Sequence, residues 1–489
     1  MKPFQIFAVA GAMSLLILGC NKFLDLDPEF TQDAENYFAN EEDYDRALTG
    51  AYDLLQTSYL TLWLGEIASD NAIAGGESVT DTEGLHEIDE MRHDAVNTEL
   101  RSLMRYNYAG VTRANFLLEN KDNIDFEGKS KIIGQARFLR AYYYFELVKC
   151  FGDVPLILDE RIGAQAVTEL ERTPKAEVYA AIEEDLKFAA ENLDWTDPVK
   201  GRVTKGSALS LLGKAQLYQG NFSDAASTLE QVITSGQYAL IDDFTQLFTV
   251  ANEGHSETVF DIEYTGLEGG SYDCFVCLEG NVAVGFHGIR QFEGPIYSTG
   301  NSYNLPTEDL YNAFDTSDLR RDATVLNIDA WIQKQANPNA ISYGIGGGGH
   351  TGFYNNKYLK RAAELGLPDN DLTTPVNYRA IRYADVLLMA AEAYAQSGND
   401  GKALTYVNEV RSRVNMPDLT SSGSQLIQDI YTERRLELSG EGHRFFDLVR
   451  TGQAADNIEG FVAGKHELFP LPQVEIDLAG GNWDQNPNY

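Results

Sequence analysis

The sequence predicts a mainly α-helical protein: a scaffold of tetratricopeptide-like helical pairs, a loop-rich irregular lobe and a few short strands. Three observations support this fold class. Apolar residues recur at three- and four-residue spacing, two stretches repeat one pattern of small residues, and one region loses helical periodicity. With 489 residues, 43% of them hydrophobic, the chain can bury enough apolar surface for more than one lobe.

Helices are expected through the first half of the chain, where Gly or Pro separates many of the amphipathic segments. The expected helices cover residues 33–56, 97–120, 131–151, 175–192, 207–218 and 223–234. We assign residues 20–256 to an N-terminal helical part on this basis.

Two stretches carry the packing residues of a tetratricopeptide repeat. The first has Leu209, Leu212, Gly213, Gly220, Phe222, Ala225 and Leu229, and the second has Leu387, Ala390, Ala391, Tyr394, Gly398, Ala403 and Val407. Small residues let two helices approach closely, and glycine lets the chain turn between them. Because such a pair cannot bury its faces alone, we expect the helical pairs to stack into one scaffold.

From about residue 257 the pattern changes to a strand followed by long loops. Phe260, Ile262 and Tyr264 alternate with two acidic residues, which predicts a half-buried strand. Residues 265–303 then hold eight glycines and six aromatic residues, and a second glycine-rich stretch surrounds Gly346 to Gly349. Long aromatic loops on a rigid scaffold are typical of binding sites, so residues 257–375 are expected to face a ligand and 376–489 to be helical again.

The N-terminus predicts a cleaved signal of the lipoprotein type. Lys2 precedes an apolar run over residues 4–18, which is short for a membrane span, and the small Gly19 stands directly before Cys20. Removal of residues 1–19 would leave Cys20 to carry the acyl chains, and two or more chains anchor a protein stably. The alternative is an ordinary signal followed by a buried cysteine.

The net charge argues against one class of partner, and the remaining cysteines allow several kinds of site. The chain has 38 basic and 74 acidic residues, a formal net charge of −36, which opposes nucleic acid as a partner. Cys274 and Cys277 could form a local disulfide, a thiol–disulfide site or half of a metal site, but a second such pair for zinc is absent from the sequence. Cys150 lies in an apolar helical run and is expected in the core.

The candidate motifs for catalysis and metal binding each lack a residue or a spacing that the known motif requires. Gly128-Lys129-Ser130 lacks the first glycine of a phosphate-binding loop, and Glu90 stands where a zinc-protease helix has its second histidine. An acidic cluster could hold Ca²⁺ but lacks the spacing of an EF-hand, so a solvated face is the preferred interpretation. The cluster comprises Asp81, Glu83, Glu87, Asp89 and Glu90. We expect no enzyme, cofactor or metal site.

Residues 433–450 alternate acids and arginines at three- and four-residue intervals, which places them on one helical face until two glycines interrupt it. A catalytic role is one interpretation. A buried ion-pair lattice that fixes two helices is preferred, because arginine's planar fork suits such pairing and the sequence places no nucleophile beside it.

Six short motifs occur in order along the chain, at residues 23–28, 135–144, 151–156, 382–393, 433–450 and 485–489. Together they resemble the motifs of the SusD/RagB family, the surface nutrient-binding lipoproteins of Bacteroidetes. Two positions depart from the family pattern: Asn488 stands where glycine is usual, and Met104 where many relatives carry tryptophan. The second departure is expected to alter packing near the ligand face.

The resemblance implies a non-enzymatic protein that lies over a SusC-like TonB-dependent transporter at the outer membrane and delivers glycans, or in some members peptides, to it. A helical-repeat scaffold for protein partners and a glycoside hydrolase remain alternatives. Ligand residues vary within the family, so candidates come from loop chemistry, since sugars stack on aromatic rings and bind polar side chains through their hydroxyls. The candidates are Trp63, Asp70, Asn71, Tyr272, Phe275, Phe286, Arg290, Tyr297, Asn301 and Trp331.

Overall fold

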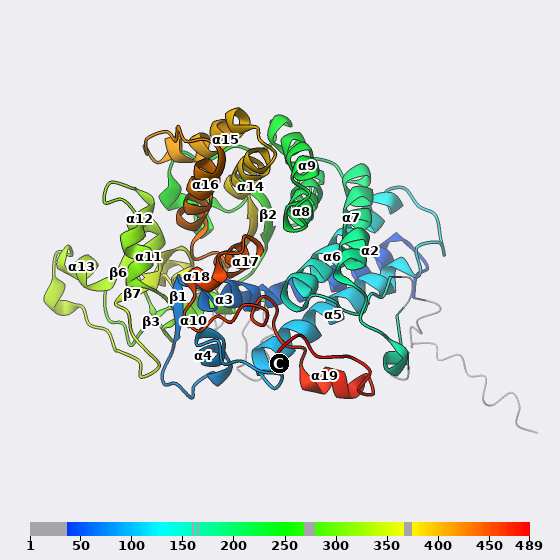
Figure 1. The fold of residues 1–489 in the computed structure, drawn as a ribbon, viewed down its shortest axis with the longest axis horizontal. Helices are drawn as coiled ribbons and strands as arrows, with labels where there is room; N and C mark the ends of the chain where they lie inside the picture. The colour runs from blue at the N-terminus through cyan, green and yellow to red at the C-terminus, as the bar shows by residue number, and fades with distance from the viewer. Residues whose placement is uncertain (1–36, 159–160, 164–165, 268–278, 366–373) are drawn as a thin grey trace, which may run out of the picture.

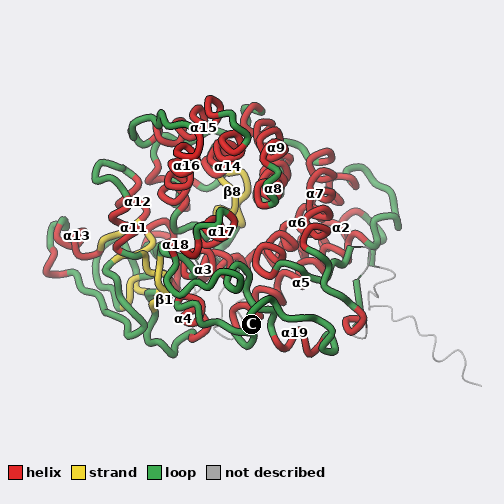
Figure 2. The backbone as a smooth tube through the Cα atoms, in the orientation of Figure 1, coloured by secondary structure: helices red, strands yellow, loops and turns green. Residues whose placement is uncertain are grey.

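The computed structural model describes residues 37–158, 161–163, 166–267, 279–365 and 374–489. Helices dominate these residues and strands are short (Figure 1), which confirms the predicted fold class. Figure 2 shows the strands gathered mainly beside the short helices of one end. Four sequence candidates, Cys20, Tyr272, Phe275 and the pairing of Cys274 with Cys277, lie outside the described residues.

The N-terminal part contains two helices that the sequence did not predict, α3 (Tyr59–Ile67) and α4 (Glu83–Asp89). Its other helices lie close to their expected positions: α2 (Glu41–Asp53), α5 (Thr98–Leu118), α6 (Lys129–Phe151), α7 (Lys175–Asn192), α8 (Lys205–Tyr218) and α9 (Phe222–Thr234). The first is shorter than predicted. The Asn40 side chain accepts a hydrogen bond from the Asp43 N–H in a capping box that starts α2, and a 3-10 turn from Leu54 to Ser58 ends it.

The lobe contains short paired strands and short helices. The strand pairs are β1 (Ala72–Gly75) with β5 (Tyr303–Pro306), β3 (Ile289–Arg290) with β4 (Thr299–Gly300), and β6 (Val325–Asn327) with β7 (Phe353–Asn355). The helices are α10 (Val282–His287), α11 (Glu308–Ala313), α12 (Arg320–Thr324) and α13 (Ile328–Gln333). Strand β1 thus brings an N-terminal segment into the lobe, while the predicted domain boundaries stay predictions.

The C-terminal part returns to helices after one strand. Its elements are β8 (Tyr378–Arg382), α14 (Tyr383–Gln396), α15 (Asp400–Arg413), α16 (Gly423–Leu438), α17 (Arg444–Arg450), α18 (Ala454–Asn457) and α19 (Gln473–Leu478). Strand β8 pairs antiparallel with β2 (Thr258–Ile262). The prediction that this strand is half-buried is wrong, since Val259 to Ile262 are all buried. The carboxylate of Asp261 can be buried because it pairs with Arg379 of β8 at 2.9 Å.

Both predicted tetratricopeptide-like units are helical pairs, α8 with α9 and α14 with α15. A Cβ at Gly213 on α8 would lie 2.5 Å from Leu229 Cγ on α9, so glycine is needed for the close approach. Gly220 has a φ of 75° at the turn between these helices. Glu230 on α9 accepts a hydrogen bond from the Tyr394 hydroxyl on α14 at 2.9 Å, which joins the two units (Figure 1).

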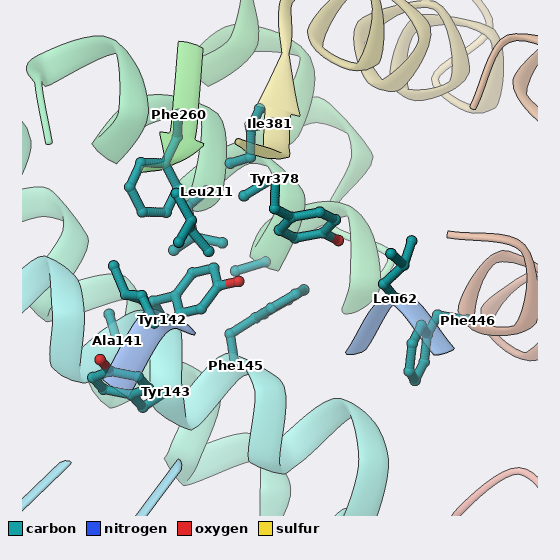
Figure 3. Close-up of a cluster of buried hydrophobic side chains, with 14 of the residues drawn as sticks. Leu62, Ala141, Tyr142, Tyr143, Phe145, Leu211, Phe260, Tyr378, Ile381 and Phe446 are labelled. Carbon is teal, nitrogen blue, oxygen red and sulfur yellow. The ribbon is translucent and has the colours of Figure 1, made fainter. Parts of the chain in front are cut away.

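The main hydrophobic core joins the helices to the β2–β8 pair. Figure 3 shows Tyr142 and Phe145 of α6, Leu211 of α8, Phe260 of β2 and Ile381 of β8 facing one another. Cys150 and Met104 are buried in the same core, which confirms the prediction for Cys150. The lobe has a second core of its own, built from residues that include Ile289, Leu305, Leu326, Ile328, Tyr354 and Leu359. Within the described ranges, every helix is too short or too polar to cross a membrane.

Candidate functional site

Three partly exposed aromatic side chains, Trp331, Tyr343 and His350, lie on the lobe, and we call them the aromatic edge. The Trp331 ring centroid is 5.1 Å from that of Tyr297, which supports it from within. The Tyr343 hydroxyl donates to Asp329 Oδ1 at 2.9 Å, and its ring centroid lies 5.7 Å from that of His350. Because one part of each ring packs and another stays exposed, these rings can stack on a ligand.

The segment beside the aromatic edge holds an unusual backbone conformation. Gln291, Ile296, Ser302 and Asn304 have positive φ angles of 47°, 71°, 59° and 54°. Such angles are unfavourable for side-chain-bearing residues, above all for a β-branched one such as Ile296, and they cluster at binding sites. The Gly344 N–H donates to the Arg290 carbonyl at 2.7 Å, which connects this segment to Tyr343.

The glycine tract from Gly346 to Gly349 is a loop, as expected, and it packs on the end of β1. A Cβ at Gly346 would lie 2.0 Å from the Gly76 carbonyl oxygen, and one at Gly348 would lie 2.1 Å from that of Gly75. The glycines are therefore needed for backbone contact, and this contact holds the tract beside the aromatic edge.

Arg290 and Asn301 are the polar candidates that the structure brings to the lobe surface. Both are partly exposed. Arg290 lies opposite Gly300 in the β3–β4 pair, so Asn301 follows directly beside it. The Arg290 guanidinium is 3.0 Å from Glu77 Oε1, a contact with one largely exposed partner. With Trp331, they are the described candidates that a ligand could reach.

Trp63 and Phe286 belong to the main core, so the prediction that they contact a ligand is wrong. Trp63 is 2% exposed and Phe286 is 7% exposed, with their ring centroids 5.4 Å apart. The Trp63 indole N–H donates to His287 Nε2 at 2.9 Å. Burial lowers the pKa of His287 to about 3, which keeps this ring neutral and able to accept.

Three further candidates have structural contacts and do not form a ligand surface: Asp70, Asn71 and Tyr297. Arg444 donates to both Asp70 carboxylate oxygens, at 2.7 and 2.8 Å. Asn71 is fully buried and accepts a hydrogen bond from Arg435 Nε at 2.9 Å. Tyr297 is 7% exposed because its ring packs against Trp331. Because of this burial and ion pairing, the prediction that these three residues contact a ligand is wrong.

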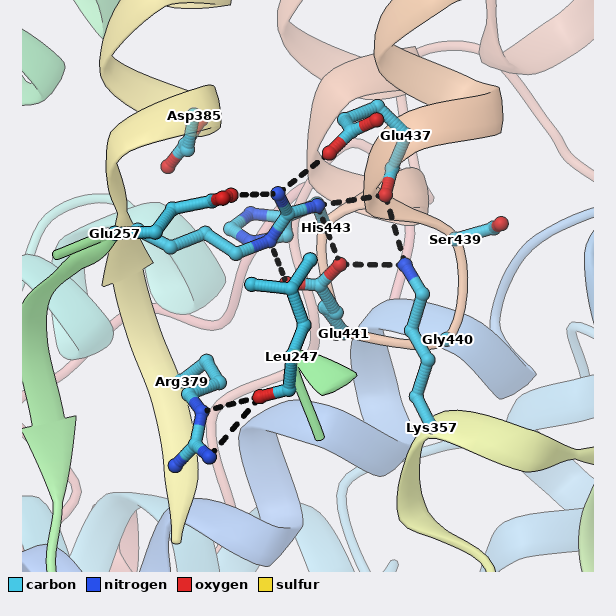
Figure 4. A network of polar contacts seen from close by, with 12 residues as sticks. Leu247, Glu257, Lys357, Arg379, Asp385, Glu437, Ser439, Gly440, Glu441 and His443 are labelled. Atoms are coloured by element: carbon cyan, nitrogen blue, oxygen red, sulfur yellow. Dashed lines mark hydrogen bonds and ion pairs between the residues drawn. The ribbon is translucent and has the colours of Figure 1, made fainter. Parts of the chain in front are cut away.

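The carboxylates of residues 433–450 form the predicted ion-pair lattice (Figure 4). Arg382 at its centre lies 2.8 Å from Glu441 Oε2, 2.6 Å from Glu437 Oε1 and 2.8 Å from Glu257 Oε1. Among the described residues, five carboxylates meet five cations in one connected set. The set is Glu257, Asp318, Glu433, Glu437 and Glu441 with Arg320, Lys357, Arg382, Arg411 and Arg413.

The pKa shifts within the lattice and the small size of the adjacent cavity both indicate that the lattice has a structural role. Burial alone would raise the pKa of Glu437, but its arginine neighbours lower that pKa well below the usual range. Burial lowers the pKa of Lys357 to about 8, although Glu441 Oε1 lies 2.6 Å away. The adjacent cavity beside Arg434 and Arg444 has a volume of about 10 Å³, too small for a ligand. The lattice fixes helices, as predicted.

The acidic cluster of residues 81–90 binds protein donors. Asp89 accepts the Ala74 N–H at 2.8 Å, and Glu87 accepts a hydrogen bond from Asn97 at 2.8 Å. Burial raises the pKa of Asp89 to about 6. In the described part of the chain, acidic, cysteine and histidine side chains do not gather in groups of three or more that could hold a metal.

The two departures from the family pattern have local explanations. Asn488 has a φ of 67° and its side chain donates to the Gly464 carbonyl at 2.8 Å. Asparagine tolerates this left-handed conformation, which explains how it replaces glycine. Met104 packs in the main core on α5, so it is not part of the aromatic edge.

Sequence reasoning missed Tyr343, Asp329 and His350. The sequence could have indicated Tyr343 and His350, because they flank the glycine tract within the predicted ligand-facing region. Asp329 could not be found from sequence, since its role depends on a contact with Tyr343.

Comparisons with known proteins match most of the chain. The sequence profile of the SusD family matches residues 234–489, and a profile described as starch-binding associating with outer membrane matches residues 22–217. SusD-like protein P2 from Formosa agariphila is 28% identical over 100% of both chains. The starch-binding protein SusD from Bacteroides thetaiotaomicron is 24% identical over 78% of this chain and 76% of its own.

Solved structures agree with the sequence profiles. A laminarin-binding SusD-like protein has a TM-score of 0.84 at 32% identity, covering 92% of this chain and 100% of that protein. Surface glycan-binding protein A from Bacteroides thetaiotaomicron, in complex with laminarihexaose, has a TM-score of 0.81 at 26% identity, with 92% and 100% covered. The SusD family profile alone spans more than half of the chain, so the chain belongs to the SusD family.

Proposed function

We propose that this protein is a cell-surface glycan-binding lipoprotein that captures oligosaccharides at the aromatic edge and passes them to a SusC-like TonB-dependent transporter. The observation that carries the proposal is the set of partly exposed rings, Trp331, Tyr343 and His350, beside a strained backbone segment on a rigid scaffold. Relatives named for laminarin and laminarihexaose make laminarin the first ligand to test.

The proposed role is binding without catalysis. A glycoside hydrolase needs two carboxyl groups placed about the scissile bond, one acting as acid and the other as base or nucleophile. Two carboxylates near the aromatic edge already have partners: Asp329 accepts from Tyr343 at 2.9 Å, and Glu77 pairs with Arg290 at 3.0 Å. Three of the relatives compared above are likewise named for binding.

Laminarin oligosaccharides are expected to bind and to leave unchanged. In calorimetry the protein should bind laminarihexaose, and mass spectrometry after long incubation should find the length of this oligosaccharide preserved, because the proposed role is binding without hydrolysis. A peptide library and a protein pull-down provide the controls for the alternative ligands. Hydrolysis that persists through repurification, or binding only of peptides or proteins, would contradict the proposal.

The anchor and the transporter complete the proposal. The profile over residues 22–217 describes proteins that associate with the outer membrane, and Cys20 stands two residues before that match begins. An acylated Cys20 would hold the protein at the outer membrane, facing the exterior, where a transporter partner can receive the glycan.

Replacing Cys20 with alanine should move the protein from the membrane fraction to the soluble fraction. The physical reason is the loss of the acyl chains, which supply the proposed membrane affinity. Cys150→Ala is the matched control and should stay with the membrane, since Cys150 is buried in the core. The test uses cells without the transporter, and unchanged membrane retention of Cys20→Ala there would count against the anchor.

A further inference from the structure

Among the described residues, the carboxylate of Asp329 uses only one of its two oxygens in a hydrogen bond. Asp329 is exposed on α13, the helix that carries Trp331, and its Oδ1 accepts from the Tyr343 hydroxyl at 2.9 Å. Within the same ranges, neither a second hydrogen bond nor an ion pair engages Oδ2. Because Asp329 is exposed beside the aromatic edge, this second oxygen is available to a ligand there.

The charge of Asp329 acts on the other two rings of the edge. Burial raises the pKa of Tyr343, and the hydrogen bond to Asp329 raises it further, so the tyrosine hydroxyl keeps its proton and donates it. Burial lowers the pKa of His350, and the negative charge of Asp329 opposes part of that shift. The carboxylate is thus close to both rings of the loop and lies on the same helix as the third ring, Trp331.

Three cations lie on the segments next to the aromatic edge, and each pairs with a carboxylate of its own. The pairs are Arg290 with Glu77 at 3.0 Å, Lys334 with Asp322 at 3.6 Å, and Arg361 with Glu364 at 3.9 Å. Glu293 is exposed and pairs through its backbone with Ser342, directly before Tyr343. In the part of the chain that the structure describes, neither Glu293 nor Asp329 has such a cation. The surroundings of the edge therefore keep negative charge that no cation offsets.

Sugar hydroxyls and acidic sugar groups differ in what they offer to a carboxylate oxygen. An exposed aspartate is ionised at neutral pH, and its oxygens can only accept hydrogen bonds. A sugar hydroxyl donates, so it can bind Oδ2 of Asp329. A sugar carboxylate or sulfate has no hydrogen to donate, and it repels the like charge. The position therefore favours a neutral sugar.

We propose that Asp329 is a specificity-determining residue of the aromatic edge. Its Oδ2 accepts a hydroxyl of the sugar that stacks at the edge, and its charge selects neutral glycans against glycans that carry carboxylate or sulfate groups. This inference rests on the proposed function and adds to it the class of glycan and the side chain that recognises it.

Calorimetry of the full chain tests this inference with laminarihexaose and with the same oligosaccharide after oxidation of its primary hydroxyls to carboxylates. We expect the native protein to prefer the neutral form by about fivefold or more, the effect of one pair of like charges about 4 Å apart in water. Asp329→Ala should weaken laminarihexaose binding about tenfold by removing a charged acceptor, and Asp329→Asn about threefold, because the amide oxygen still accepts. Asp329→Asn should also remove most of the preference for the neutral form, which a purely structural role of Asp329 would leave in place.

Asp315→Asn is the matched control, because it removes the same charge from the same lobe outside the aromatic edge. Asp315 is exposed between α11 and α12, where its carboxylate accepts from Ser317. This variant should keep both affinities and the preference for the neutral form. Raising the salt concentration to about 0.5 M should reduce the preference of the native protein, since salt screens exposed charges.

Two results would overturn the role of Asp329: Asp329→Ala binds laminarihexaose as the native protein does, or Asp329→Asn keeps the full preference for the neutral form. Both results leave the proposed function intact, provided that Trp331→Ala weakens binding. A native protein that does not bind laminarihexaose would instead contradict the proposed function and, with it, this inference.

Discussion

Arg382→Met is expected to lower the free energy of unfolding by about 3 to 5 kcal/mol, because it leaves buried carboxylates without their central cation. The Arg382 side chain is 1% exposed and pairs with Glu257, Glu437 and Glu441. The lattice balances five carboxylates against five cations, so the substitution leaves one buried negative charge uncompensated.

Urea denaturation followed by circular dichroism measures this loss. Arg92→Met is the matched control, since Arg92 pairs with Glu90 where both side chains are about half exposed, at 53% and 52%. Such a surface pair contributes about 0 to 1 kcal/mol. Arg382→Lys keeps the charge but loses the planar fork, so its stability should lie between those of the native protein and Arg382→Met. Equal losses for Arg382→Met and the control would contradict the structural role of the lattice.

The sequence could predict the lattice but not its partners. Glu433 and Glu437 are spaced by four residues, which indicates one helical face without any knowledge of the fold. Their cations come from elsewhere: Arg320 lies on α12 of the lobe and Arg382 at the end of β8. Pairings over such sequence separations are set by the tertiary arrangement, which local spacing does not report.

The helices and repeats were predictable because their signals are local. Helix α7 begins and ends where its apolar spacing predicts, and Gly220 marks the turn of the first repeat. Burial of single aromatics was harder to predict. Trp63 lies in the apolar run of α3, where every residue is buried, whereas Trp331 lies on a short helix beside exposed Asp329 and Gln333. Neighbouring residues, more than residue type, separate core rings from surface rings.

Trp331→Ala and Tyr343→Ala should each weaken binding of laminarihexaose while leaving the melting temperature close to that of the native protein. Loss of one stacking ring costs about 1 to 2 kcal/mol, or roughly five- to thirtyfold in affinity. Both rings are partly exposed, so their removal opens little new cavity. Calorimetry gives the affinities, and thermal unfolding gives the stability of each variant.

Two control substitutions separate stacking from folding in this experiment. Tyr106→Ala removes a partly exposed ring from α5, away from the aromatic edge, and should bind normally. Trp63→Ala should lose about 3 to 5 kcal/mol of stability because it empties a core site, while the protein that stays folded keeps its affinity. If Trp331→Ala and Tyr343→Ala bind as the native protein does, or weaken no more than Tyr106→Ala, the glycan does not bind at the aromatic edge.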